Sequence, residues 1–173
     1  EEEKTEEKKS RRKFLRDVFK VLNIREKDML FMYYGIYGYT YKLEDIGHKY
    51  KLTKERVRQI IEKTRKQIGE LENEIAIQGI RYKNILLDES AWKYLKEALQ
   101  NKECVVISDI LSIIKDEECG LSNDFVMLVI ALLLRNDYHL VGKSPLRQDQ
   151  CLWKGTYLIK KELSEAFEFG KII

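Results

Sequence analysis

Between residues 43 and 69 the chain carries two short apolar rhythms, separated by a break at residues 51–52. The first rhythm has the i, i+3, i+4, i+7 spacing of one helix face: Leu43, Ile46, Gly47 and Tyr50. The second has the same spacing at Val57, Ile60, Ile61, Thr64 and Ile68. Thr53 precedes the second rhythm, where a hydroxyl can accept a hydrogen bond from a free backbone N–H. This pattern predicts two helices joined by a tight turn, an arrangement whose second helix normally enters the DNA major groove.

The polar side of the second predicted helix carries side chains suited to base edges. These residues lie opposite the apolar face: Lys54, Glu55, Arg58, Gln59 and Glu62. Lysine can donate to guanine, glutamate can accept from the cytosine amino group, and glutamine can contact adenine. An ordinary solvated helix has a similar face, but the preceding helix, the turn and the cap favour DNA binding.

Two segments resemble a known family. Residues 22–36, LNIREKDMLFMYYGI, followed by residues 43–63, LEDIGHKYKLTKERVRQIIEK, are similar to region 4 of bacterial RNA polymerase sigma factors of the primary type. The resemblance covers about residues 14–72. At residues 53–60, TKERVRQI, the chain departs from the family pattern only by a lysine in place of arginine at position 54.

The resemblance implies that this module recognises the upstream promoter hexamer and docks on the flap of the polymerase β subunit. Lys54, Glu55 and Gln59 would then meet base edges, and Arg56, Arg58 and Lys63 would support phosphate or neighbouring contacts. Lys54 lacks the two-pronged fork of the family's arginine. Where the family has a capping threonine this chain has Lys42, so either Thr40 caps a longer helix or Lys42 approaches phosphate. The predicted DNA-binding residues are Lys42, Thr53, Lys54, Glu55, Arg56, Arg58, Gln59 and Lys63.

Charge supports the same location for a nucleic-acid interface. Residues 42–66 hold nine basic and four acidic side chains, a net charge of +5, whereas residues 81–173 hold 13 basic and 14 acidic side chains, a net charge of −1. Because DNA affinity depends on the basic groups that face phosphates, we expect the first half of the chain to bind DNA.

The segment before the helix-turn-helix is expected to contact polymerase. Residues 1–13 read as a charged, flexible tail, in which residues 11–13 either touch phosphate or begin a solvated helix. A broad apolar stripe follows, and a domain of about sixty residues buries only part of such a surface. The predicted polymerase-binding residues are Phe14, Val18, Phe19, Leu22 and Phe31. The alternative is that residues 88–173 cover this stripe.

The pattern of the second half predicts a small α+β unit, and the protein as a whole is expected to be mostly α. The expected divisions are a tail (1–13), a sigma region 4-like domain (14–79) and a C-terminal domain (80–173). Helices are expected over residues 90–100, 108–114 and 124–135, a short strand or extended turn over 104–107, and strands over 138–141 and 152–159. Three helices followed by a hairpin is the order of a winged helix, with residues 142–150 as the wing. Protein contact or packing is favoured over DNA reading here, because helix 124–135 is mostly apolar. Lys143, Arg147 and Lys154 could still reach a phosphate backbone.

Composition limits the remaining functions. A chain with 35% charged residues and no apolar run of about 18 residues predicts a soluble protein without a membrane span. An odd number of cysteines, three, without a signal peptide favours a cytoplasmic protein with reduced thiols, and the expected DNA binding would make it nucleoid-associated. No catalytic motif is present, so we expect no enzyme activity, cofactor, metal or small-molecule substrate.

The expected partners are double-stranded promoter DNA and the RNA polymerase core. The alternative function is a polymerase-binding regulator that uses the sigma-like fold without reading promoters itself.

Overall fold

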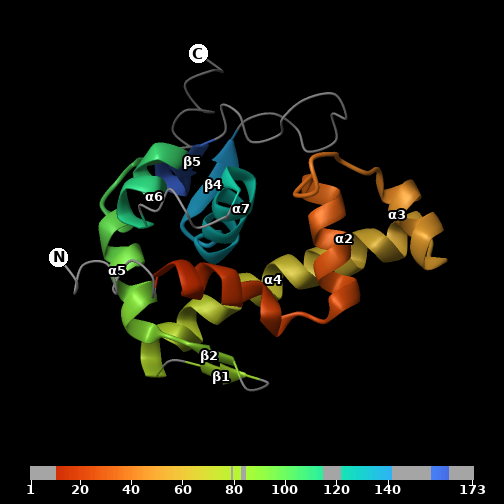
Figure 1. Cartoon of the computed structure of the whole chain (residues 1–173). Helices are drawn as coiled ribbons and strands as arrows, with labels where there is room; N and C mark the ends of the chain where they lie inside the picture. Colours follow the sequence, from red (N-terminus) through yellow and green to blue (C-terminus); the bar gives the residue numbers. More distant parts are fainter. Residues whose placement is uncertain (1–10, 79, 83–84, 115–121, 142–156, 164–173) are drawn as a thin grey trace, which may run out of the picture.

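The computed structural model describes residues 11–78, 80–82, 85–114, 122–141 and 157–163. The first half is helical: a helix over residues 11–18 runs into the 3₁₀ turn η1 (Phe19–Val21) and is followed by three α-helices. These are α2 (Ile24–Tyr34), α3 (Leu43–Tyr50) and α4 (Lys54–Gln78). The long helix α4 runs from α3 at one end of the molecule to α5 near the other (Figure 1).

The second half mixes helices with short strands. Its elements are β1 (Ile80–Tyr82), β2 (Ile85–Leu87), α5 (Glu89–Gln100), β3 (Cys104–Val106), α6 (Ile107–Ile114), α7 (Asn123–Leu133), β4 (Tyr138–Val141) and β5 (Tyr157–Lys160). The pair β1–β2 is antiparallel, with Arg81 opposite Leu86. The expected fold class, a helix-turn-helix domain followed by a small α+β part, is confirmed.

The sheet of the second half differs from the predicted two-stranded hairpin. Its strand order is β3-β5-β4, so β5 pairs with β4 and also, on its other edge, with β3. The extended segment before α6 supplies this third strand, with Val105 opposite Leu158. The predicted wing and the residues Lys143, Arg147 and Lys154 lie outside the described residues, as does most of the predicted tail.

Local sequence explains where several helices begin and end. Asn23 caps α2 through a capping box, in which its side chain accepts from Glu26 N–H at 2.7 Å and its own N–H faces the Glu26 carboxylate at 3.4 Å. Gly35 ends α2 in the left-handed conformation with φ 73°, which glycine adopts without a steric penalty. Asp88 and Ser122 cap α5 and α7. These caps and helix ends depend on residues that lie within a few positions of one another in the sequence.

One hydrophobic core runs through both halves. Phe14 stacks on Trp92 of α5 with ring centroids 5.8 Å apart. Phe125 at the start of α7 meets the edges of Phe19 and Phe31, with centroids 5.4 and 5.9 Å away. Helix α4 packs against α2 and α3 on one part of its length and against α5 and α7 on the other. The two halves are therefore held together by aromatic packing as well as by a continuous helix.

The stripe predicted to contact polymerase lies inside this core. Its residues Phe14, Val18, Phe19, Leu22 and Phe31 are between 0% and 8% exposed. Trp92 and Phe125 of the C-terminal half cover the stripe, which is the alternative that the sequence left open. A partner cannot reach these five side chains while the two halves stay packed together.

The basic residues that precede the stripe also have an internal role. Arg11 donates to the backbone oxygen of Ile113 at 2.7 Å, and Arg12 donates to that of Ile114 at 3.0 Å. Both carbonyls belong to the last turn of α6, where free acceptors and the negative end of the helix dipole favour cations. Arg11 also lies over the Tyr94 ring, 3.7 Å from its centroid. The expectation that these arginines touch phosphate or simply begin a solvated helix is wrong, because both side chains are buried.

In the part of the chain that the structure describes, no helix combines the length and apolarity that a membrane crossing requires.

The shared core predicts that the two halves unfold together. Trp92→Ala removes a fully buried ring and should destabilise the chain by about 3–5 kcal/mol. Amide hydrogen exchange measured in urea should show that this variant loses protection in α2 and α4 as well as in α5 and α7. Lys93→Ala, at an exposed neighbour on α5, is the matched control. Lost protection confined to residues 88–163 would instead support two independently folding domains, as the predicted boundary at residues 79–80 implies.

Candidate nucleic-acid interface

The turn between α3 and α4 depends on a close approach of two backbone segments. Lys51 ends α3 in the left-handed conformation with φ 55°, and Leu52 N–H donates to Gly47 O at 2.9 Å. A Cβ atom on Gly47 would lie only 2.5 Å from the backbone oxygen of Leu52. Glycine is therefore required at this position because any larger residue would collide with the turn.

The two helices of the motif begin differently. Thr53 caps α4 as predicted, since its hydroxyl oxygen accepts from Arg56 N–H at 3.1 Å. Helix α3 begins at Leu43 after Lys42, whose side chain makes no capping hydrogen bond. Thr40 is buried and lies before the helix, so the longer, Thr40-capped helix is not formed. Lys42 is exposed beside the first turn of α3.

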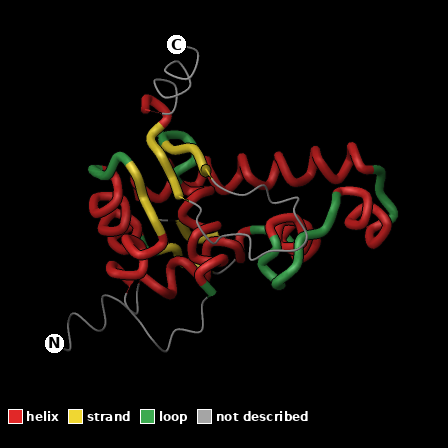
Figure 2. Tube along the Cα trace, turned by 90° about the horizontal axis from the view of Figure 1, so that it is seen from above, coloured by secondary structure: helices red, strands yellow, loops and turns green. Residues whose placement is uncertain are grey.

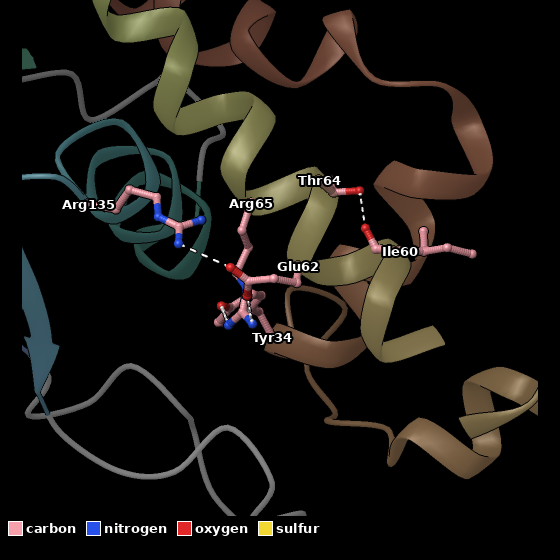
Figure 3. A network of polar contacts seen from close by, with 6 residues as sticks. All are labelled: Tyr34, Ile60, Glu62, Thr64, Arg65 and Arg135. Carbon is pink, nitrogen blue, oxygen red and sulfur yellow. Dashed lines mark hydrogen bonds and ion pairs between the residues drawn. The ribbon is translucent and has the colours of Figure 1, made fainter. Parts of the chain in front are cut away.

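The two faces of α4 divide as the sequence pattern predicts. Val57, Ile60, Ile61, Thr64 and Ile68 are all buried, between 0% and 5% exposed. Thr64 satisfies its hydroxyl by donating to Ile60 O at 2.7 Å within the helix (Figure 3). The eight predicted DNA-binding side chains are all exposed: Lys42, Thr53, Lys54, Glu55, Arg56, Arg58, Gln59 and Lys63. Lys42 directly precedes α3, Thr53 directly precedes α4, and the other six lie in the first three turns of α4. Figure 1 shows that α3 lies at the end of the molecule away from α5 and α6, and Figure 2 shows the same end from above.

The exposed polar side chains pair with one another. Arg58 makes two hydrogen bonds to the Glu55 carboxylate, at 3.0 and 2.5 Å, and Arg56 donates to Gln59 Oε1 at 3.4 Å. The hydrogen bonds from Arg58 lower the pKa of Glu55. Because exposed ion pairs of this kind contribute little net stability, they can be exchanged for contacts to bases and phosphates at small cost. Glu55 and Gln59 are thus accessible acceptors at the exposed start of α4.

Glu62 lies on the same polar face but is committed to a different set of contacts. Its carboxylate accepts at 3.1 Å from Nη2 of Arg135, in the turn that follows α7. It also pairs with Arg65, which donates to the Tyr34 hydroxyl at 2.9 Å (Figure 3). Burial raises the pKa of Glu62, but the two guanidinium groups outweigh burial and leave that pKa below its ordinary value. The sequence pattern placed Glu62 among base-reading residues; its contacts instead join α4 to the turn after α7 and, through Arg65, to Tyr34 of α2.

A second polar cluster fixes α3 against α2. Asp28 accepts from Tyr37 at 2.8 Å, from Lys49 at 2.7 Å and from Tyr50. Burial raises the pKa of Asp28, but these hydrogen bonds lower it further than burial raises it. Burial and the hydrogen bond to Asp28 raise the pKa of Tyr37 to about 12. Sequence reasoning missed this cluster because its members come from α2, α3 and the loop between them, with no regular spacing.

Aromatic rings in the loop between α2 and α3 pack against one another and against α2. Tyr39 and Tyr41 meet edge to face with centroids 4.9 Å apart, and Tyr37 lies against Phe31 at 5.9 Å. Tyr37 and Tyr39 are still 57% and 43% exposed, so their outer faces remain at the surface.

Comparison with known proteins gives one match. Residues 18–69 match the family model described as sigma-70, region 4. No curated protein and no solved structure matches the chain. The matched segment contains α2, α3, the turn and the exposed start of α4, and these residues form a sigma-70 region 4 domain with a DNA-binding helix-turn-helix.

The close approach at Gly47 predicts that Gly47→Ala destabilises the chain by about 1–3 kcal/mol through overpacking of the turn. Urea unfolding measures this, and His48→Ala, an exposed neighbour in α3, should stay within about 0.5 kcal/mol of the parent. An equally stable Gly47→Ala chain would show that the turn relaxes without cost.

The Asp28 cluster predicts stability losses at both ends of the pH scale. Because the pKa of Asp28 is lowered on folding, this carboxyl stabilises the folded chain above pH 3.8, its ordinary pKa. That stabilisation is lost as the pH falls through the pKa of the folded state. The raised Tyr37 pKa has the opposite sign: its contribution is complete below pH 10.0 and is lost as pH rises toward about 12.

Thermal unfolding across pH tests both signs. Asp28→Asn should reduce the fall in melting temperature at acid pH, and Tyr37→Phe should reduce the fall at alkaline pH. Glu97→Gln, at an exposed carboxyl on α5, should change neither. If both cluster variants kept the parental pH dependence of the melting temperature, the cluster would not contribute to stability as predicted.

Proposed function

We propose that this chain is a sigma factor-like, sequence-specific DNA-binding protein of transcription initiation, which recognises the upstream promoter element and docks on the RNA polymerase core. The observation that carries the proposal is the exposed polar face over residues 53–59, held by the Thr53 cap and the Gly47 turn within a sigma-70 region 4 domain. The expected absence of enzyme activity accords with a DNA-binding domain.

In this proposal the first turns of α4 enter the major groove. Lys54, Glu55 and Gln59 reach base edges, since their side chains leave the helix on its exposed side. Arg56, Arg58 and Lys63 stand beside them and neutralise phosphates. Lys42 and Thr53 sit at the starts of the two helices, where backbone phosphates flank the groove. A lysine at position 54 donates as a single point charge, so it selects guanine less sharply than an arginine fork does.

Docking on polymerase requires a surface other than the buried stripe, or the release of that stripe from the C-terminal half. Phe19 and Phe31 are closed off by Phe125, so a partner that uses them must displace α7. The flap of the β subunit is the partner that the resemblance to region 4 implies.

We further infer that the second half is a winged helix used for packing. Helix α5, strand β3, helices α6 and α7 and the strands β4 and β5 follow one another in that order, with β3 completing the sheet. Eight consecutive residues of α7, 126–133, are buried, and the helix packs on α4. A helix with so little exposed surface is better suited to support α4 than to read bases.

The DNA-reading proposal predicts different outcomes for two kinds of substitution. Replacing Gln59 or Glu55 by alanine should change preference at one base position by roughly 1–3 kcal/mol. Lys63→Ala should weaken binding to all sequences alike, because a phosphate contact carries no base information. Selection of bound duplexes from a randomised pool, followed by titration of the selected duplexes, measures both effects.

Unchanged binding of promoter fragments by a Lys54/Glu55/Gln59 triple alanine variant would contradict base reading by α4. If that variant also co-purified with core polymerase as the parent does, the alternative function, a polymerase-binding regulator that does not read promoters, would be supported.

A further inference from the structure

A cleft lies between α4, α7 and β4 on the flank of the helix-turn-helix. Its volume is about 260 Å³, and its charged and imidazole-bearing lining consists of Glu62, Arg65, Arg135, His139 and Lys161. Among the described lining residues Glu62 is the single carboxylate, set against three cations. The cleft therefore carries an excess of positive charge although the second half of the chain as a whole is slightly acidic.

The two arginines are not saturated by Glu62. Arg135 Nη1 and Arg65 Nε are both buried and have no acceptor among the described residues. Buried N–H donors are usually satisfied, because each unpaired group costs free energy. The remaining hydrogen-bonding capacity of this pair, together with Lys161, suits an anion with several oxygen acceptors, such as a phosphate group.

The cleft continues the DNA-facing side of α4. Glu55, Arg58, Glu62 and Arg65 follow the i, i+3, i+7, i+10 spacing, which places them on one face of the helix. Arg65 is seven residues beyond Arg58, a rise of about 10 Å along the axis. Since the major groove is about 12 Å wide, a helix whose first turns read bases passes the phosphate backbone at about this distance. Figure 3 shows Arg65, Glu62 and Arg135 together on this flank, with Thr64 turned away from them.

We propose that the cleft lined by Arg65, Arg135, His139 and Lys161 binds a backbone phosphate of the same DNA duplex that α4 reads. The inference rests on the proposed DNA-binding function and adds the C-terminal half to the interface. It gives that half a role in affinity and positioning rather than in base readout, because phosphate contacts carry no sequence information. Glu62 then has two tasks: it holds the two arginines in place, and it moderates the charge that the phosphate meets.

The salt dependence of DNA binding tests this site. In Lys161→Gln the slope of log K against log salt should fall by about one, as for the loss of one phosphate contact, and base preference should not change. Arg135→Gln should act in the same direction. The probe is a duplex of mixed sequence, because a phosphate contact is present on any sequence. Lys93→Gln on α5, which removes an equal charge outside the cleft, should keep the parental slope.

Glu62→Gln provides a variant of opposite sign. The amide oxygen can still accept from Arg135 and Arg65, whereas the negative charge is removed, so binding should tighten and the slope steepen. Urea unfolding of every variant shows whether it is folded before its slope is compared. Weaker binding by a folded Glu62→Gln chain would contradict the inference.

The outcomes separate this inference from the proposed function. If the parent chain binds no duplex, both fall. If the parent binds and the folded cleft variants keep its slope and affinity, only the inference falls. A third arm adds inorganic phosphate at constant ionic strength: if it raises the melting temperature of the parent but not of Lys161→Gln, while the DNA slopes stay equal, the site takes free phosphate and the DNA assignment is overturned.

Discussion

The packing of Phe125 against Phe19 and Phe31, together with the stacking of Phe14 on Trp92, is the interaction on which the rest of the structure depends. A region 4-like domain of about sixty residues buries a smaller fraction of its surface by itself than a larger domain does. In this chain the C-terminal half supplies the missing cover. The helix-turn-helix is consequently presented by a larger body, and its orientation relative to α7 and β4 is set by a shared core instead of a flexible linker.

That shared core gives polar residues on one face of α4 two different roles. At residues 54–59 the side chains are solvated, and their mutual pairs can be exchanged for DNA contacts at little cost. One turn later Glu62 meets Arg65 and Arg135, partly out of water, where loss of one partner would leave an uncompensated charge. The change from solvated polar side chains to polar side chains paired with the C-terminal half therefore falls within a single helix, between Gln59 and Glu62.

The same packing bears on how a polymerase partner could be engaged. The apolar stripe of the N-terminal segment is occupied by residues of the chain itself, and Arg11 and Arg12 bond the last carbonyls of α6 from the same segment. Access to the stripe would require these aromatic contacts to open, and with them the hydrogen bonds that end α6. A partner that binds the closed chain has to use surface outside the core, such as the exposed side of α2 where Ile24 is 84% exposed.

The sequence by itself determined the helix-turn-helix. The apolar spacing of α3 and α4, the Thr53 cap and the exposed polar residues from Lys42 to Lys63 all depend on neighbours within one or two helical turns, and such patterns are legible along the chain. The sequence did not determine contacts whose two partners come from distant segments of the chain. Only the tertiary structure decided that the Phe14–Phe31 stripe is covered, that Arg11 and Arg12 end α6, that β3 joins the sheet, and that Glu62 faces Arg135. Each of these rests on a contact between residues far apart in sequence, for which periodicity and capping rules carry no information.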